Sequence, residues 1–215
     1  MTIIARPRIW IPSALLALLA VVVPAGNATA TPGLLKAKNG TANFCLDPQA
    51  RQALDAAGIT MSAGAPAQLV TTGPQPCVTT HVMEGEISLG LTEGTFPFRG
   101  AITFSRSTDN TQVTFSDIAV TFAVPSTATA VVDGNTAAPI TLLAFLPLPG
   151  NIMTDGRYLI AHDVPLNLAA DGTNAFTTAF GASPVATGGP LFVGTGYGEL
   201  EVDGLPLPVI GGLPT

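Results

Sequence analysis

The stretch 113–124 alternates apolar and polar side chains, and this alternation constrains the fold more than any other feature of the chain. Its apolar members are Val113, Phe115, Ile118, Val120, Phe122 and Val124. The phase of the alternation changes once, at Asp117. A period of two places successive side chains on opposite faces of a β-strand, so that one face packs on a core while the other meets solvent. The stretch therefore predicts a long, half-buried strand with an irregularity at Asp117.

Other runs of strand-like residues follow one another along the chain, separated by turns rich in Gly, Pro, Asn and Asp. They lie at 41–46, 77–91, 96–104, 140–148, 157–168 and 191–202. Helices are expected at 48–57, which Asp47 and Pro48 begin, and at 169–180, which Gly181 ends. About eight strands with one or two short helices predict a mainly β fold, an antiparallel β-sandwich or a barrel-like domain.

The first 30 residues have the three-part pattern of a secretory signal peptide. Arg6 and Arg8 precede an apolar run over 10–23, and small residues follow up to Ala30. The apolar run is about 14 residues long, whereas a membrane span needs roughly 20. We therefore expect a signal peptide at 1–30, a β-domain at 31–203 and a flexible Pro/Gly-rich tail at 204–215. The expected location is secreted, extracellular or in the cell envelope, with membrane attachment only if the leader stays uncleaved.

The charge pattern disfavours nucleic acid as a partner. The chain has 8 basic and 14 acidic residues, and only 10% of its residues are charged. Loss of Arg6 and Arg8 with the leader would leave 6 basic residues and a net charge of −8. Nucleic acids bind through clustered Lys and Arg, and no such cluster follows Arg8.

The cysteines are Cys45 and Cys77. In an oxidising compartment an isolated pair is most simply one disulfide. The alternative is a thiol nucleophile beside His81. Zinc is disfavoured because the spacing of the two Cys and two His residues matches no finger or ribbon pattern.

The residues best suited to hold a cofactor are Tyr158 and His162, with Tyr197 as a third candidate. The even spacing of Tyr158 and His162 puts both on one face of a strand. Tyr or His can coordinate haem iron axially. The alternative is that Tyr158 packs within the sheet and His162 belongs to a turn beside Asp163.

Catalytic motifs are weak. His162 and Asp163 are neighbours in an expected strand and point to opposite faces, which does not suit a catalytic triad. The pairs Glu84/Glu86 and Glu199/Glu201 each share a face, as glycoside hydrolysis requires, but such pairs also occur on solvated sheet faces. We therefore expect a protein that is not an enzyme.

Four stretches of the chain, taken in order, resemble secreted actinobacterial β-rich proteins loosely related to the HtaA-type domain. They are LDPQARQALDAAGIT at 46–60, GAITF at 100–104 with VTFSDI at 113–118, VPLNL at 164–168 with NAFTTAFG at 174–181, and GTGYGELEV at 194–202. HtaA-type domains bind haem through Tyr and His. In this chain Phe98 and Arg99 precede Gly100, where the family has a histidine. The resemblance therefore implies the sandwich-like plan more than the ligand set.

These observations lead to a main prediction and two alternatives. The main prediction is a secreted, non-enzymatic interaction or structural module with no cofactor, whose partner is an unknown protein or envelope component. The first alternative is a carrier of haem or of a small hydrophobic ligand, and the second is a hydrolase.

Overall fold

The computed structural model describes residues 34–71, 73–88, 90–148, 150–202 and 205–206, and the described residues fall within one compact unit. The expected signal peptide and most of the expected tail lie outside the described residues. The strands are β1 (Leu34–Leu46), β2 (Ile59–Gly64), β3 (Gln68–Val70), β4 (Cys77–His81), β5 (Gly85–Ser88), β6 (Gly94–Pro97), β7 (Ala101–Arg106), β8 (Thr111–Phe122), β9 (Ser126–Val132), β10 (Ile140–Phe145), β11 (Ile152–Asp155), β12 (Tyr158–Leu168), β13 (Pro190–Val202) and β14 (Leu205–Pro206). The helices are α1 (Pro48–Ala56) and α2 (Ala170–Phe180).

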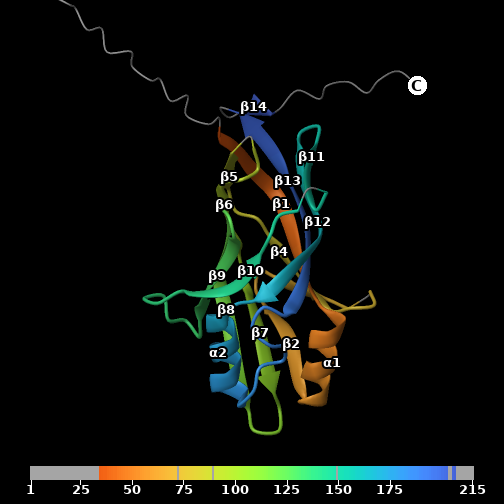
Figure 1. Ribbon diagram of the computed structural model, residues 1–215, viewed down its shortest axis with the longest axis vertical. Helices are drawn as coiled ribbons and strands as arrows, with labels where there is room; N and C mark the ends of the chain where they lie inside the picture. The colour runs from red at the N-terminus through yellow and green to blue at the C-terminus, as the bar shows by residue number, and fades with distance from the viewer. Residues whose placement is uncertain (1–33, 72, 89, 149, 203–204, 207–215) are drawn as a thin grey trace, which may run out of the picture. The chain divides into compact units, whose positions relative to one another are not determined.

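The strands form one antiparallel sheet that closes on itself (Figure 1). Eight strands make the ring, in the order β13, β12, β10, β9, β8, β6, β5 and β1, and β1 pairs with β13 to close it. The remaining strands extend this barrel: β4 and β3 continue from β1, β7 and β2 continue from β8, β11 pairs with β12, and β14 pairs with β13. The prediction of a mainly β, barrel-like domain with short helices is confirmed.

The expected irregularity at Asp117 is a β-bulge. The pairing of β8 with β9 shifts between Ser116 and Ala119, and Asp117 has a φ of 47°. A bulge of this kind changes which face the following side chains occupy. A second bulge interrupts β12, where the pairing with β13 shifts between Ala161 and Val164 and Asp163 has a φ of 50°.

Several strands differ from the prediction: the stretch 96–104 forms two strands, β6 and β7, and β9 lies outside the predicted runs. β1 begins at Leu34 rather than at Thr41, and its pairing with β13 shifts at a bulge between Lys38 and Thr41. The stretch 77–91 forms two strands, β4 and β5, instead of one. At the start of β5, a Cβ on Gly85 would lie 2.6 Å from the Phe96 ring and 2.7 Å from the Thr95 carbonyl oxygen, so β5 and β6 approach too closely for a side chain there.

Both helices form where the sequence predicts them. The Asp47 carboxylate accepts a hydrogen bond of 2.8 Å from the Gln49 amide, which caps α1. Gly181 ends α2 in the left-handed conformation, with a φ of 79°. Neither helix in the described part of the chain has the length and hydropathy needed to cross a membrane.

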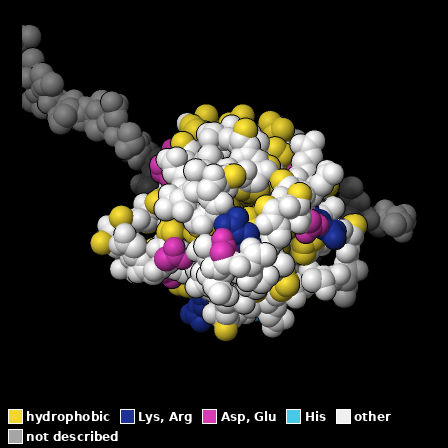
Figure 2. Space-filling view, turned by 90° about the horizontal axis from the view of Figure 1, so that it is seen from below, with side chains coloured by type: hydrophobic (Ala, Val, Ile, Leu, Met, Phe, Trp, Pro, Cys, Tyr) yellow, Lys and Arg dark blue, Asp and Glu magenta, His cyan; other side chains and the backbone are white. Residues whose placement is uncertain are grey.

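Aromatic side chains dominate the core. In the half of the barrel that α2 covers, Phe176 packs its ring 4.9 Å from that of Phe104 and 5.6 Å from that of Phe115. In the other half, the ring of Phe122 lies 5.4 Å from Phe96 and 5.9 Å from Phe145. The surface seen from below carries few charged side chains among many uncharged ones, as the low charge content predicts (Figure 2).

A disulfide joins Cys45 of β1 to Cys77 of β4, the pairing that the sequence predicts. The two cysteines lie directly opposite each other in the antiparallel register of these strands. The bond therefore attaches β4, which lies outside the barrel ring, to a strand of the ring.

Candidate functional site

The three candidate haem ligands occupy the outer face of β12 and β13. Tyr158 lies opposite Glu199, and Ile160 lies opposite Tyr197. The intervening residues Leu159 and Ala161 line the barrel interior. Strand alternation therefore turns Tyr158, Ile160 and His162 outward, and Tyr197 is 50% exposed on the same face. The expectation that Tyr158 and His162 share a face agrees with this arrangement, although neither side chain reaches the interior.

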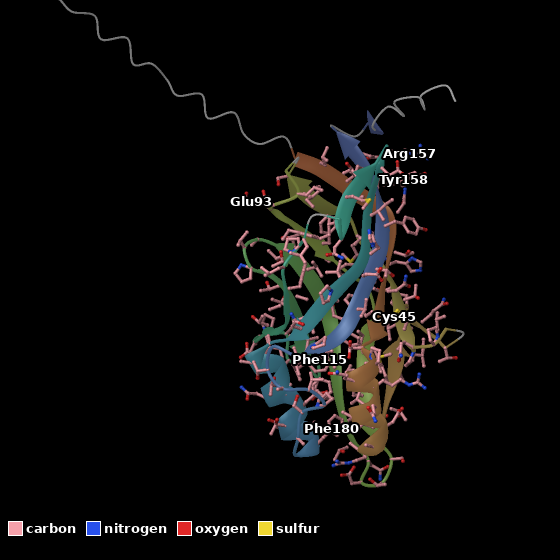
Figure 3. The ribbon with its side chains drawn as sticks, turned by 45° about the vertical axis from the view of Figure 1, so that its right-hand side comes forward. Cys45, Glu93, Phe115, Arg157, Tyr158 and Phe180 are labelled. Atoms are coloured by element: carbon pink, nitrogen blue, oxygen red, sulfur yellow. A yellow bond between two sulfur atoms is a disulfide. The ribbon has the colours of Figure 1, made fainter. Side chains whose placement is uncertain are left out.

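The two tyrosines differ in what already binds their hydroxyl groups. The Arg157 guanidinium donates a hydrogen bond of 3.0 Å to the Tyr158 hydroxyl and lies 5.2 Å from the centre of its ring (Figure 3). This hydrogen bond, with the nearby charge of Glu199, raises the pKa of Arg157. No described residue hydrogen-bonds the Tyr197 hydroxyl. Tyr197 is therefore the more available ligand.

His162 lies apart from these contacts, at the bulge of β12. Its Nδ1 atom is 3.7 Å from an oxygen of the Asp163 carboxylate, and both side chains are largely exposed. That distance is too long for a hydrogen bond. The pair does not form the oriented His–carboxylate contact that a catalytic triad needs.

Tyr197 stands in the middle of a row of side chains that crosses the outer face of the sheet. On one side its register partner is Thr41 of β1, which pairs with His81 of β4. On the other side its partner is Ile160 of β12, which pairs with Met153 of β11. The Arg99 amide donates to the His81 carbonyl oxygen, so Arg99 is next in line. We call this set the outer row: Arg99, His81, Thr41, Tyr197, Ile160 and Met153.

The outer row combines metal-ligand, apolar and cationic side chains. Neighbouring strands are about 4.8 Å apart, so His81 and Met153 each lie about 10 Å from Tyr197 along the row. Met153 is 39% exposed and so offers apolar surface on the same face as Tyr197. Among the Lys and Arg residues of the described chain, Arg99 alone forms no ion pair. Its guanidinium is therefore free to bind an anionic group.

Sequence reasoning missed Arg99, His81 and Met153 as members of one site, because they come from segments far apart in the chain. One signal was present. A disulfide between Cys45 and Cys77 in paired antiparallel strands also places Thr41 opposite His81, since each lies four residues from its cysteine.

A cavity of about 100 Å³ lies inside the barrel, behind the sheet that carries the outer row, and Thr41 and Tyr197 are among the residues that line it. Its inward-facing side chains are hydrocarbon, among them Phe96, Phe122 and Leu159, and no Asp, Glu, Lys, Arg, His or Cys lines it. Ligand pockets usually measure about 300–1,000 Å³. The interior is too small for haem, whereas the outer row supplies Tyr, His and Met, all of which can coordinate haem iron.

Three of the four carboxylates considered for hydrolysis, Glu84, Glu199 and Glu201, are held in ion pairs. The Glu84 carboxylate accepts a hydrogen bond of 3.1 Å from the Lys36 ammonium group, and the Glu201 carboxylate lies 2.7 Å from the Lys38 ammonium group. The Glu199 carboxylate lies 3.3 Å from the Arg157 guanidinium and accepts a hydrogen bond of 3.1 Å from the side-chain amide of Asn39. Within the described residues, no group of three or more His, Cys, Asp or Glu could hold a metal ion. These contacts give the hydrolase alternative no support.

Comparison with known proteins identifies the fold. No family model matches the sequence, and no curated protein matches it. The solved structure of the C-terminal domain of HtaA from Corynebacterium glutamicum is similar, with a TM-score of 0.54 and 12% identity over 77% of this chain and 99% of that domain. The heme binding protein HtaB from the same organism has a TM-score of 0.50 and 14% identity over 79% of this chain and 96% of its own.

The chain therefore has an HtaA-like fold, as the resemblance in its sequence implies. The finding contradicts our main prediction of an interaction or structural module, because a solved protein with this fold is a haem-binding protein. Neither solved protein is described as an enzyme. The likeness favours the first alternative, a carrier of haem or of a small hydrophobic ligand, over the main prediction.

Proposed function

We propose that this protein is a haem carrier that binds haem on the outer row, with the Tyr197 oxygen as the iron ligand. The observation that carries the proposal is the position of Tyr197. It is half exposed, its hydroxyl group has no partner among the described residues, and the outer row continues from it through Thr41 to His81 and through Ile160 to Met153. The likeness to HtaB supports the proposal, because that protein shares the fold and binds haem.

Each member of the outer row has a part in this function. Tyr197 supplies an oxygen ligand of the kind that some haem proteins use. Ile160 and Met153 offer apolar surface to the flat face of the macrocycle, and Arg99 offers a cation to its carboxylates. His81 offers an imidazole at the Arg99 end of the row. Tyr158 is the less suitable ligand, because Arg157 already binds its hydroxyl group.

A haem titration with matched tyrosine variants tests the proposal. We expect the wild-type protein to shift and sharpen the Soret band of added haemin with a saturating, one-to-one dependence. Tyr197→Phe removes only the ligand oxygen and should weaken binding at least tenfold. Tyr158→Phe makes the same change two residue pairs away and should leave the titration within about twofold of wild type, because its oxygen is held by Arg157.

Two outcomes would contradict the proposal. A flat titration of the wild-type protein would refute haem binding altogether. A Tyr197→Phe protein that binds haemin as tightly as wild type, with an unchanged spectrum, would refute the assignment of the ligand. Circular dichroism of each variant would establish that the fold is intact.

We further propose that the protein works outside the cytoplasm, in the medium or the cell envelope. The signal-peptide pattern at 1–30 supports this location. The disulfide between Cys45 and Cys77 supports it as well, because such bonds persist mainly in oxidising compartments. Fractionation of the native host, with detection in medium, envelope and cytoplasm, tests the location, and a purely cytoplasmic protein would contradict it.

A further inference from the structure

The cavity inside the barrel lies against the inner face of the strands that carry the outer row. In β13, strand alternation turns the Tyr197 side chain outward, whereas Gly196 and Gly198 face inward and line the cavity. In β1, Thr41 faces outward and Ala42 faces the cavity. The same two strands therefore present a polar outer face and an apolar inner face.

The inward-facing side chains around the cavity are hydrocarbon. They come from five strands of the barrel and include Phe96, Phe122, Phe145, Ile152 and Leu159. The polar residues of the lining stand at outward positions of β1 and β13, and they are Thr41, Asn43, Thr195 and Tyr197. A water molecule inside the barrel would therefore meet apolar side chains on all of these strands, and a hydrocarbon molecule loses no hydrogen bonds there.

The size of the cavity limits its occupant to a small molecule. Its volume is about 100 Å³, well below the roughly 300–1,000 Å³ of most ligand pockets. An apolar cavity of about 150 Å³ binds benzene or xenon and excludes water. A cavity two thirds of that size, with a similar lining, suits one molecule no larger than an aromatic ring.

Gly198 is a second indication that this space serves a purpose. A Cβ on Gly196 would lie 2.7 Å from the Thr41 carbonyl oxygen, so the close approach of β1 to β13 requires glycine there. A Cβ on Gly198 would lie 3.6 Å from the Ala37 Cβ, which is an ordinary van der Waals distance, and Gly198 does not have a positive φ.

Neither a close contact among the described residues nor a left-handed backbone thus requires glycine at position 198. Glycine inside a strand weakens it, and an unfilled cavity lowers stability. An alanine at this position would relieve both effects. The space that Gly198 leaves inside the barrel is the remaining reason for it.

We propose that the interior of the barrel binds one small, uncharged hydrocarbon molecule. The molecule packs against the rings of Phe96 and Phe122, the side chain of Leu159 and the backbone of β13 at Gly198. The proposal does not rest on haem binding, although the cavity and the outer row share β1 and β13.

Titration with benzene and phenol, followed by NMR, tests this proposal. The two probes differ by one hydroxyl group, for which the inward side chains offer no hydrogen-bond partner. We expect saturable one-to-one binding of benzene, with chemical-shift changes at the lining residues. Phenol should bind at least about tenfold more weakly, because its hydroxyl group would be buried without a partner. Xenon is a smaller apolar probe and should bind at the same residues.

A matched pair of variants locates the site. Ala161→Leu adds bulk at an inward position of β12 that lines the cavity and should weaken benzene binding at least about tenfold. Ala119→Leu makes the same change in β8, outside the lining and next to the lining residue Val120, and should leave the affinity unchanged. Benzene should raise the Tm of the wild-type and Ala119→Leu proteins but not that of Ala161→Leu.

A smaller change at Gly198 tests the same site with less risk to the fold. Gly198→Ala adds one methyl group at an ordinary contact distance and should weaken benzene binding while raising the Tm. Gly73→Ala makes the same change in an exposed loop, where the added Cβ would meet only the Gln75 carbonyl oxygen at 3.8 Å. This control should bind benzene like the wild-type protein.

The proposal is wrong if the wild-type protein binds neither benzene nor xenon. It is also wrong if Ala161→Leu, folded by circular dichroism, or Gly198→Ala binds benzene as tightly as wild type. Equal affinities for phenol and benzene would refute the hydrocarbon class of the ligand. Benzene binding is measured without haemin, and haemin binding without benzene, so failure of one proposal can be told apart from failure of the other.

Discussion

The two tyrosines Tyr158 and Tyr197 differ in whether their hydroxyl groups already have a hydrogen-bond partner. The Tyr158 hydroxyl is bound by Arg157, which in turn holds Glu199. Tyr197, on the same face of the next strand, has no such contact among the described residues. A polar group that is free and exposed can bind a ligand without first breaking an internal hydrogen bond. This difference, rather than residue type, separates the two tyrosines.

Asp109 in the turn between β7 and β8 shows how such partners affect stability. Arg106 donates hydrogen bonds to its carboxylate, as do the hydroxyl and amide of Thr111. Hydrogen bonding from Arg106, and then from Thr111, lowers the pKa of Asp109 far below its usual range. A lowered pKa in the folded state means that the stabilisation is present above about pH 4 and is lost as the pH falls further.

We therefore expect Asp109→Asn to remove an acid-sensitive part of the stability. The Tm of the wild-type protein should fall more steeply than that of Asp109→Asn between pH 5 and pH 2, as measured by circular dichroism. Asp163→Asn, which removes a carboxylate at the exposed bulge of β12, should keep the wild-type slope. Parallel curves for wild type and Asp109→Asn would contradict this expectation.

At the scale of elements, α2 closes one end of the core with its aromatic face. Phe176 is fully buried and touches Phe104 of β7 and Phe115 of β8. Phe176→Ala would leave a cavity among these rings and should lower the free energy of unfolding by about 3–5 kcal/mol. Thr178→Ala, on the exposed side of the same helix, should change it by less than about 0.5 kcal/mol. Urea denaturation measures both, and equal effects would contradict the packing of α2.

The disulfide acts between elements, because it attaches β4 to β1. The two cysteines are 32 residues apart in the chain. On the chain-entropy model, a loop of this length stabilises the folded state by about 3–4 kcal/mol. We expect the double variant Cys45→Ala/Cys77→Ala to lose about this amount in urea denaturation without reductant. Reductant should lower the stability of the wild-type protein by a similar amount and leave the variant unchanged. A loss below about 1 kcal/mol would contradict a stabilising role.

At the scale of the whole molecule, the local patterns were predictable and the long-range pairings were not. The alternation at 113–124 predicted β8 and its bulge at Asp117, and the caps at Asp47 and Gly181 predicted both helices. The closure of the barrel depends on pairing β1 with β13, whose residues are far apart in sequence. Local periodicity contains no information on which strands pair, so sandwich and barrel were not distinguishable.

The candidate site was predictable only in part, for the same reason. Tyr197 was identified as a candidate ligand from its residue type. The even spacing of Tyr158 and His162 along a strand predicted that both lie on one face. Arg99, His81 and Met153 join Tyr197 only through the registers of separate strand pairs.

The closure of β13 onto β1 also has a consequence for the behaviour of the protein in concentrated solution. Exposed sheet edges offer unpaired backbone groups to other chains and are sites of aggregation. In the described part of the chain, the strands that keep one side unpaired along their length are β2, β3, β11 and β14, which have 6, 3, 4 and 2 residues. Such short edges are poor templates for pairing with another molecule. A protein with few charges to keep its copies apart thus gains protection from aggregation through its topology.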